Sequence, residues 1–218
     1  MELTFKSEMF AIFDDVLTRV DLDALRKHFR EGRFSHISNF RARSRVFGIL
    51  DGDPLVGPSV VQHHPTGLKG ATPYPAGNAI DALVQALDDN SNELVPWTGT
   101  QGVSWDFFTC TPYLYPVGSG LSWHDDAEER SASYVFYLHD DWRASWGAEL
   151  LIGGNGDVAN RAELLNGMPV PSVGSYVMPH PNRLVVIKSG TPHAVKRVDV
   201  TAGENIRMSI AGFFQQLS

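Results

Sequence analysis

The residues most able to do chemistry lie in a short stretch, residues 121–126, which reads Leu-Ser-Trp-His-Asp-Asp. This stretch places His124 and Asp126 two positions apart. In an extended strand, residues i and i+2 point to the same face, so an imidazole and a carboxylate are predicted to face one point. A second histidine, His193, lies much later in the chain, directly after a proline. Since histidine is the most common metal ligand in proteins, these three residues indicate a metal centre.

The ligand types favour iron. Two histidines and one carboxylate form the facial triad of non-haem Fe(II) oxygenases, which leaves coordination positions open for substrate and oxygen. By itself the pair His124-x-Asp126 fits a surface turn equally well, because the chain has 8 histidines and short motifs match by chance. Arg207 adds to the pattern, since a lone cation in an apolar terminal segment must be paired. A structural salt bridge is the alternative interpretation of Arg207.

The elements that must hold these residues are short strands. From Trp105 onward, apolar residues recur with a period of two, and turns rich in Gly and Pro separate most of the segments. Residues 153–173 lack a clear period and are predicted to form a loop. Many short strands after a helical start predict a mainly β (α+β) fold, a double-sheet jelly roll (double-stranded β-helix) with N-terminal helices packed on one sheet. The predicted strands are 105–114, 132–139, 148–152, 174–178, 183–188, 193–198 and 205–214.

The N-terminal half has a different pattern. A short apolar run at residues 9–13 predicts a strand. A helix is expected next, capped by Asp21 or Asp23 and ended by Gly32. Asn78 is expected to cap a second helix. The predicted apolar faces of the two helices contain Leu22, Leu25 and Phe29, and Ile80, Leu83, Val84 and Leu87.

Two stretches are expected to form the mouth of the pocket. Residues 33–77 predict an irregular connection with one possible strand at 46–50, and long irregular connections are often functional loops. Together with residues 153–173 they are expected to border the pocket. We expect a single domain over 1–218, with an N-terminal layer at 1–104 and the jelly-roll core at 105–218.

Composition excludes several classes of protein. The net charge of −7 argues against nonspecific nucleic-acid binding, which needs a basic surface. No apolar stretch approaches the length of a membrane span, and the N-terminus does not resemble a signal peptide. Cys110 is the only cysteine, so an intramolecular disulfide is impossible, and a cytoplasmic location is expected. Neither nucleic acid nor a membrane is therefore an expected partner.

Residues 105–214 resemble the Fe(II)/2-oxoglutarate dioxygenases, and within them the prolyl 4-hydroxylase-like branch that includes the hypoxia-sensing prolyl hydroxylases. The similar segments follow one another in the order of the family and cover half of the chain. They are Tyr115 to Asp126, Arg130-x6-Tyr137 to Trp142, Trp146 to Leu150, Asn182 to Ile187, Pro192 to Val195, and Arg207 to Ile210.

The resemblance implies roles for individual residues. It implies that His124, Asp126 and His193 bind Fe(II), and that Arg207 binds the 5-carboxylate of 2-oxoglutarate. It also implies that Tyr115 and Tyr137 line the cosubstrate pocket. Ser209, two positions along the strand from Arg207, can add a hydroxyl at the same end. O2 is the further cosubstrate, and ascorbate is expected to support turnover.

The expected activity is hydroxylation of an unactivated C–H bond, with decarboxylation of 2-oxoglutarate to succinate. The substrate is expected to be a small amino-acid-like or peptidyl molecule, bordered by Trp123, Arg130 and Trp142. Core packing is the alternative for at least two of Trp123, Trp142 and Trp146.

Two features depart from the pattern of the family. The usual Gly-Gly-x-Leu reads Gly147-Ala148-Glu149-Leu150, and the long interval between His193 and Arg207 predicts an added hairpin turn at residues 198–204. Both weaken the inference of a prolyl substrate.

Rival functions remain open from sequence alone. Desaturation could occur on the same scaffold. Halogenation is disfavoured, because Asp126 fills the position that a chloride would need. A catalytically silent jelly-roll binding or sensor module is a non-enzymatic alternative, since one fold hosts many functions.

Overall fold

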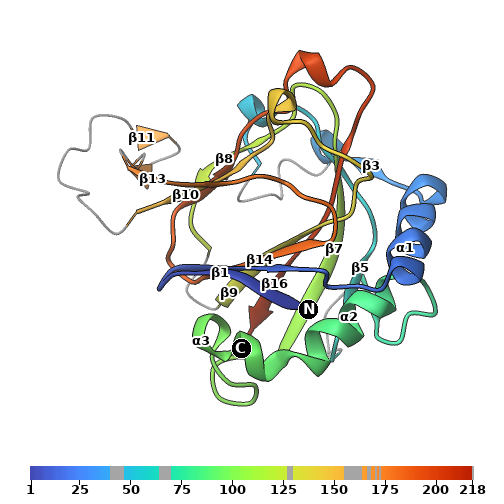
Figure 1. Ribbon diagram of the computed structural model, residues 1–218, viewed down its shortest axis with the longest axis vertical. Coiled ribbons are helices and arrows are strands. Elements are labelled where there is room, and N and C mark those ends of the chain that lie inside the picture. The colour runs from blue at the N-terminus through green and yellow to red at the C-terminus, as the bar shows by residue number, and fades with distance from the viewer. Residues whose placement is uncertain are drawn as a thin grey trace.

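The computed structural model describes residues 1–39, 47–63, 70–126, 130–154, 171 and 173–217, together with the backbone of residues 164–165 and 168–169. Its larger sheet has ten strands, ordered β1-β2-β14-β9-β16-β7-β4-β3, with β5 beside β7 and β6 beside β5 (Figure 1). The strands are β1 (Glu2–Lys6), β2 (Phe10–Asp14), β3 (Ser35–His36), β4 (Leu55–Val56), β5 (Ser59–Val61), β6 (Ala71–Pro73), β7 (Phe107–Tyr115), β9 (Arg130–Tyr137), β14 (Arg183–Lys188) and β16 (Arg207–Gln215).

A smaller sheet faces the larger one and has the order β13-β10-β15-β8. Its strands pair antiparallel, as do the central strands of the larger sheet. A two-stranded ladder, β11 with β12, lies apart from both sheets. The strands are β8 (Leu121–His124), β10 (Leu150–Gly153), β11 (Leu164–Leu165), β12 (Met168–Pro169), β13 (Gly174–Val177) and β15 (His193–Val195).

Among the described residues, three α-helices precede the core strands, and their apolar faces cover the outer face of the larger sheet (Figure 1). They are α1 (Arg19–Glu31), α2 (Ile80–Asp89) and α3 (Ser91–Thr98). Short 3-10 turns also occur: η1 (Ile37–Asn39), η3 (Ile49–Asp51), η4 (Ala144–Trp146) and η5 (Val200–Ala202).

The larger sheet separates two apolar layers because strand side chains alternate between faces. On β9, Phe136 packs with the helices in the outer layer, whereas Val135 and Tyr137 pack in the inner layer between the sheets. On β14, Leu184 and Val185 divide in the same way. The smaller sheet closes over the inner layer, and this confirms the predicted double-sheet jelly roll with helices on one sheet.

Most predicted elements are confirmed, with shifts of a few residues at their ends. The strand predicted at 183–188 coincides with β14, and the strand at 9–13 matches β2 within one residue. The two helices bury the predicted apolar faces, and the first ends before Gly32. Ala79 is the N-cap of α2, one residue after the predicted Asn78, although Asn78 Oδ1 still accepts a hydrogen bond from the N–H of Ile80 at 2.9 Å.

The N-cap of α1 was predicted wrongly. Thr18 is the capping residue, and its hydroxyl accepts from the N–H of Asp21 at 3.2 Å. The Asp21 carboxylate in turn accepts from the Thr18 hydroxyl at 2.6 Å. Asp21 and Asp23 therefore lie inside the helix, where an acidic residue in the first turn stabilises the positive end of the helix dipole.

Three connections also differ from the prediction. Where described, residues 47–50 form no strand, and η3 begins at Ile49; residue 46 lies outside the described residues. Residues 153–173 contain the short β11 and β12, although most of this stretch also lies outside the described residues. Residues 198–204 contain the 3-10 turn η5 and no hairpin, because the strands on either side, β15 and β16, belong to different sheets.

Gly147 and Ala148, which stand where the family usually has two glycines, adopt an unusual backbone conformation. Both residues have left-handed φ angles, 70° for Gly147 and 63° for Ala148. Glycine adopts such angles freely, whereas other residues do so rarely. Ala148 is fully buried in a small cluster with Tyr115 and Trp142. The chain thus keeps at Ala148 the conformation that a second glycine would adopt more easily.

In the described part of the chain, no helix is both long and apolar enough to cross a membrane.

A bidentate ion pair joins β2 to β14, and we expect it to make stability depend on pH. Arg183 donates from Nε and Nη2 to the two carboxylate oxygens of Asp14, at 2.7 and 2.9 Å. Burial raises the pKa of Asp14, but the hydrogen bonds and charge of Arg183 outweigh it and hold the pKa below its usual value. A lowered carboxyl pKa stabilises the fold above the unfolded value of about 3.9 and stops doing so as the pH falls through the folded value.

Arg183→Ala is therefore expected to lower the free energy of unfolding by about 1–3 kcal/mol at pH 7, a range typical for a hydrogen-bonded charge left without its partner. Urea denaturation at several pH values measures this. The difference from wild type should stay constant above about pH 5 and shrink below about pH 4. Lys27→Ala is the control, because its pair with Glu31 is exposed. A difference independent of pH would contradict the assigned role of Asp14.

Candidate metal centre

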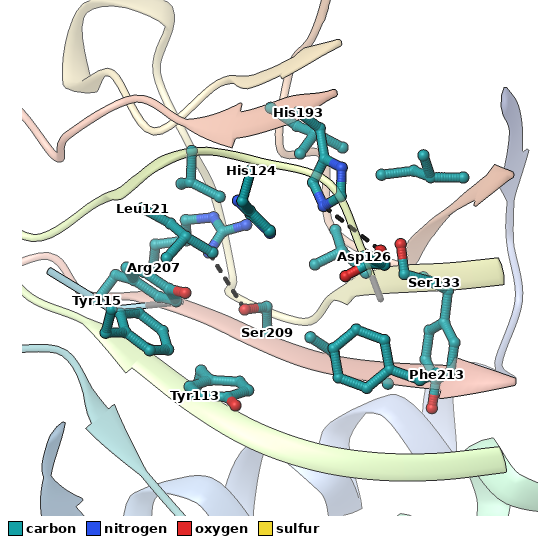
Figure 2. Close-up of a pocket in the computed structure, with 18 of the residues that line it drawn as sticks. Tyr113, Tyr115, Leu121, His124, Asp126, Ser133, His193, Arg207, Ser209 and Phe213 are labelled. Atoms are coloured by element: carbon teal, nitrogen blue, oxygen red, sulfur yellow. Dashed lines mark hydrogen bonds and ion pairs between the residues drawn. The ribbon is translucent and has the colours of Figure 1, made fainter. Parts of the chain in front are cut away.

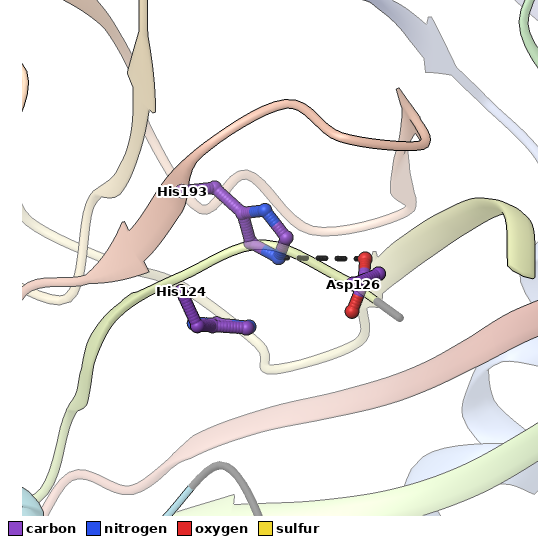
Figure 3. A group of neighbouring side chains, drawn as sticks. All are labelled: His124, Asp126 and His193. Carbon is purple, nitrogen blue, oxygen red and sulfur yellow. Dashed lines mark ion pairs between the residues drawn. The ribbon is translucent and has the colours of Figure 1, made fainter. Parts of the chain in front are cut away.

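The three predicted ligands meet at one end of the smaller sheet. His124 is the last residue of β8, His193 is the first of β15, and the two residues pair directly across the ladder. Their ring centroids are 4.2 Å apart, and His193 Nε2 lies 3.8 Å from Asp126 Oδ2. Each residue offers one ligand atom, and these atoms all lie within 4.8 Å of one another (Figure 3). The geometry is that of a mononuclear site with donors on one side.

Backbone carbonyls orient both imidazoles. His124 Nδ1 lies 2.8 Å from the carbonyl oxygen of Ser122, and His193 Nδ1 lies 2.9 Å from that of Thr191. An Nδ1–H that donates to a carbonyl leaves the Nε2 lone pair free for a metal. Burial, followed by the neighbouring His193, lowers the pKa of His124 to about 4. The His124 ring is therefore neutral at physiological pH, as metal binding requires.

Arg207 lines the same cavity as the triad and has no exposed surface. Its guanidinium carbon is 4.7 Å from the ring centroid of Tyr115 and 4.9 Å from that of Tyr137. Its Nη1 donates to Ser209 Oγ at 3.3 Å, whereas Nε and Nη2 are buried without a partner. Within the described residues no carboxylate pairs with Arg207, so the geometry does not support the structural salt bridge that the sequence left open.

The hydroxyl of Tyr137 is also buried without a partner. Burial raises the pKa of Tyr137, and the positive charge of Arg207 only partly opposes this effect. The phenol is therefore protonated and can donate. A planar fork with free donors beside a free phenol O–H suits a carboxylate, which accepts several hydrogen bonds at once.

One cavity of about 360 Å³ is lined by both the triad and Arg207 (Figure 2). Most of its wall is apolar, and the polar groups converge at the triad and around Arg207. Its lining includes Ile37, Phe47, Tyr113, Tyr115, Leu121, His124, Asp126, Arg130, Ser133, His193, Arg207, Ser209 and Phe213.

The comparisons with known proteins agree with this geometry. Residues 110–215 match the model of the 2OG-Fe(II) oxygenase superfamily, and this segment includes the triad and Arg207. The chain belongs to the 2OG-Fe(II) oxygenase superfamily. It is a 2-oxoglutarate-dependent dioxygenase, as the resemblance in its sequence implied. No curated protein shows significant sequence similarity to it.

Solved structures resemble this oxygenase at the level of the fold. A prolyl-4-hydroxylase from Pseudomonas putida is 20% identical, with a TM-score of 0.61 and coverage of 96% of this chain and 93% of that chain. A prolyl hydroxylase from Trichoplax adhaerens, in complex with a hypoxia inducible factor peptide fragment, is 15% identical, with a TM-score of 0.61 and coverage of 96% and 84%. A 2OG-Fe(II) oxygenase family oxidoreductase from Burkholderia pseudomallei is 13% identical, with a TM-score of 0.63 and coverage of 100% and 97%.

The residues of this oxygenase fit the cofactors of its superfamily, Fe(II), 2-oxoglutarate and O2. The two imidazoles and the Asp126 carboxylate are a donor set that suits Fe(II) and leaves further coordination positions open. The orphaned donors of Arg207 and Tyr137 fit an anion that the described residues do not supply.

Arg130 lies at the metal end of the cavity. Its Nη1 is 3.4 Å from Asp126 Oδ1, and its guanidinium carbon is 3.6 Å from the centroid of the Phe213 ring. Its Nε is buried without a partner, and so is the hydroxyl of Ser133 nearby on β9. Arg130 therefore lines the cavity beside a metal ligand, and its role toward a substrate stays a prediction.

The two tryptophans predicted to border the substrate lie outside this cavity. Trp123 lines a smaller surface hollow with Leu151 and Lys196, because it alternates with His124 along β8. Trp142 is buried in the cluster that also contains Tyr115, and its Nε1 donates to the carbonyl of Gly147 at 2.8 Å. Core packing, the alternative kept for the tryptophans, describes Trp142.

Sequence reasoning did not single out several lining residues. Ile37 and Phe47 come from the stretch 33–77 that was expected to border the pocket, whereas residues 40–46 and 64–69 lie outside the described residues. Ser133 and Phe213 face the cavity by the two-residue period of β9 and β16, which was recognised without deciding which face was inner. Tyr113 follows the same alternation from Tyr115.

Proposed function

We propose that this oxygenase hydroxylates an unactivated C–H bond of a small amino-acid-like or peptidyl substrate, with decarboxylation of 2-oxoglutarate to succinate. The single observation that carries the proposal is the buried, unpaired fork of Arg207, in the cavity that also holds the triad. This fork argues for an anionic ligand in the cavity of the triad, because burying an unpaired charge is unfavourable.

In this proposal, one group of cavity residues binds 2-oxoglutarate and another group binds Fe(II). Arg207, Ser209 and Tyr137 hold the far carboxylate of 2-oxoglutarate, and the apolar wall excludes water. His124, Asp126 and His193 hold Fe(II). Bound Fe(II) and 2-oxoglutarate supply the oxidative decarboxylation that activates O2: the cosubstrate loses CO2, succinate keeps one oxygen atom, and the substrate gains the other.

The substrate side is proposed to be the end at Arg130. The free Nε of Arg130 and the free hydroxyl of Ser133 are donors, and Phe213 provides an apolar surface beside them. An amino-acid-like or peptidyl substrate offers both a carbonyl or carboxylate oxygen and an aliphatic group. The Trichoplax adhaerens structure contains a peptide fragment, which supports a peptidyl substrate as one form of this proposal.

The whole chain, 1–218, is proposed to act as one domain, because β1 and β2 extend the sheet of β14.

The test measures succinate released from 2-oxoglutarate with Fe(II) and ascorbate, with and without a panel of free amino acids and short peptides. We expect one substrate class to raise succinate release and to gain one oxygen atom in its product mass. Asp126→Ala protein is the negative control. A product that loses two hydrogen atoms would show desaturation, and one that gains chlorine would show halogenation. Absence of succinate from wild-type protein, with and without the panel, would contradict enzymatic function.

A further inference from the structure

A buried carboxylate outside the triad contacts the strand that carries His124. Asp51 ends the 3-10 turn η3 and is only 3% exposed. Its Oδ1 accepts from the backbone N–H of Ser122 at 2.8 Å and from the Ser122 hydroxyl at 2.5 Å. Its Oδ2 accepts from the N–H of Gly48 at 2.6 Å. Asp51 therefore binds β8 on one side and its own turn on the other.

The Asp51 carboxylate accepts hydrogen bonds from uncharged donors, two backbone N–H groups and one hydroxyl. In the described part of the chain Asp51 makes no ion pair. A buried carboxylate without a cation is tolerated only where its hydrogen bonds satisfy it. Because both oxygens accept, only a carboxylate satisfies this set of donors. An asparagine would turn an NH2 group toward either Gly48 or Ser122, and two donors would then face each other.

The bonds of Asp51 lead directly to a metal ligand. The carbonyl oxygen of Ser122, the residue that Asp51 holds by its N–H and hydroxyl, accepts from His124 Nδ1 at 2.8 Å. The backbone carbonyl of Asp51 also accepts from the N–H of Gly120 at 2.9 Å, so the turn contacts β8 and its approach at two points. His193, in contrast, is oriented from the turn that precedes β15, through Thr191.

The backbone of the η3 turn lies very close to the backbone of the residues that precede β8. Gly52 has a φ of 75°, and a Cβ added there would lie 2.6 Å from the carbonyl oxygen of Gly118. Arg197 also donates from Nη2 to the carbonyl of Leu50, which ties the same turn to the smaller sheet. At the other end of the segment, Phe47 lines the cavity, and its ring centroid is 5.9 Å from that of Tyr113.

We propose that Asp51 is a positioning residue of the metal centre. It fixes the Ser122 peptide, and the Ser122 carbonyl holds His124 in the orientation and the tautomer whose Nε2 faces the metal. Groups that orient a ligand from outside the metal's own coordination shell commonly change metal affinity by about 10–100-fold when they are lost. The inference rests on the proposed metal centre and is independent of the proposed substrate chemistry.

The first experiment reads the imidazole directly in the metal-free protein. Long-range 1H–15N NMR distinguishes the two tautomers of a neutral histidine. Wild-type protein should show His124 with its proton on Nδ1, and Asp51→Asn should shift His124 toward a mixture while His193 keeps its tautomer. An unchanged His124 signal in a folded Asp51→Asn protein would overturn the proposal. This readout needs neither metal nor turnover, so it also stands if the proposed function fails.

The second experiment titrates the metal-free protein with Co(II), whose visible spectrum reports the ligand field. Asp51→Asn is expected to weaken Co(II) binding by about 10–100-fold and to change the spectrum of the bound ion. At saturating Fe(II), the KM for 2-oxoglutarate should stay within about twofold of wild type, because Arg207 on β16 is not touched. A merely structural role would lower the unfolding midpoint and leave affinity and spectrum unchanged, and that result would also overturn the proposal.

Two further variants control the comparison. Asp53→Asn is the matched control, because Asp53 also accepts from the N–H and hydroxyl of one serine, Ser38, but does not contact β8. It should bind Co(II) like wild type. Ser122→Ala removes only the hydroxyl and keeps the backbone N–H, so it should fold even if Asp51→Asn does not. We expect a smaller loss of Co(II) affinity in Ser122→Ala, and wild-type affinity there would count against the proposal when Asp51→Asn cannot be purified.

Discussion

Replacing Asp126 with alanine will abolish iron binding and turnover together. Asp126 supplies the only carboxylate of the triad, its side chain is almost fully buried, and one of its oxygens lies 3.8 Å from His193 Nε2. Two neutral imidazoles alone bind a divalent ion weakly, because the charge of the ion is then not balanced by any ligand. The loss of the carboxylate also removes the anion with which Arg130 pairs in the described part of the chain, 3.4 Å away. Metal repelled by an unpaired cation should bind more weakly still.

The measurement is iron content per chain after anaerobic loading, beside the rate of succinate release. We expect stoichiometric iron in wild type and almost none in Asp126→Ala, and the same result for His124→Ala and His193→Ala. Asp125→Ala is the matched control, because Asp125 is an adjacent, exposed aspartate outside the cluster. It should keep both iron and activity. An Asp126→Ala protein with full iron and wild-type hydroxylation would show that the ligand assignment is wrong.

The local part of this site could be predicted from sequence, since it depends on the two-position spacing of His124 and Asp126, although β8 itself ends at His124. His124 and Asp126 lie two positions apart, and the structure brings them to one point as the pattern predicts. The same alternation puts Trp123 on the opposite side of β8, a consequence that was available from sequence but was not drawn. Likewise, Thr18 with Asp21 three positions later is a capping pattern that the sequence contained.

The long-range part depended on strand pairing, which composition does not encode. His193 reaches His124 only because β15 pairs with β8 in one register, and a shift of one residue would turn its side chain to the other face. The resemblance to a known family supplied that pairing. Asp51 had no such support. It lies in an irregular segment rich in Gly and Pro, where no periodicity distinguishes a buried carboxylate from an exposed one.

Arg207 is expected to carry most of the affinity for 2-oxoglutarate. It is a fully buried cation with two unpaired donors, beside the free hydroxyl of Tyr137. Hydrogen bonds to charged groups contribute about 1.5–3 kcal/mol each. Because about 1.4 kcal/mol corresponds to a tenfold change in affinity, Arg207→Ala should raise the KM for 2-oxoglutarate at least tenfold. Arg207→Lys keeps the charge but loses the planar fork, so it should lie between alanine and wild type.

The experiment measures both the KM for 2-oxoglutarate and the iron content of each variant. The iron content should stay at the wild-type level, because no metal ligand is changed. Ser209→Ala is the graded control: it removes the one hydroxyl that Arg207 contacts, at 3.3 Å, and should raise the constant less than Arg207→Ala does. An unchanged constant in Arg207→Ala would mean that another cation holds the carboxylate. Arg183 is already paired with Asp14, and Lys188 is exposed at the other end of β14, so neither is placed to replace it. An unchanged KM would therefore contradict the proposal that Arg207 and its neighbours bind the carboxylate of 2-oxoglutarate. The triad would then be the only part of the site with an assigned ligand.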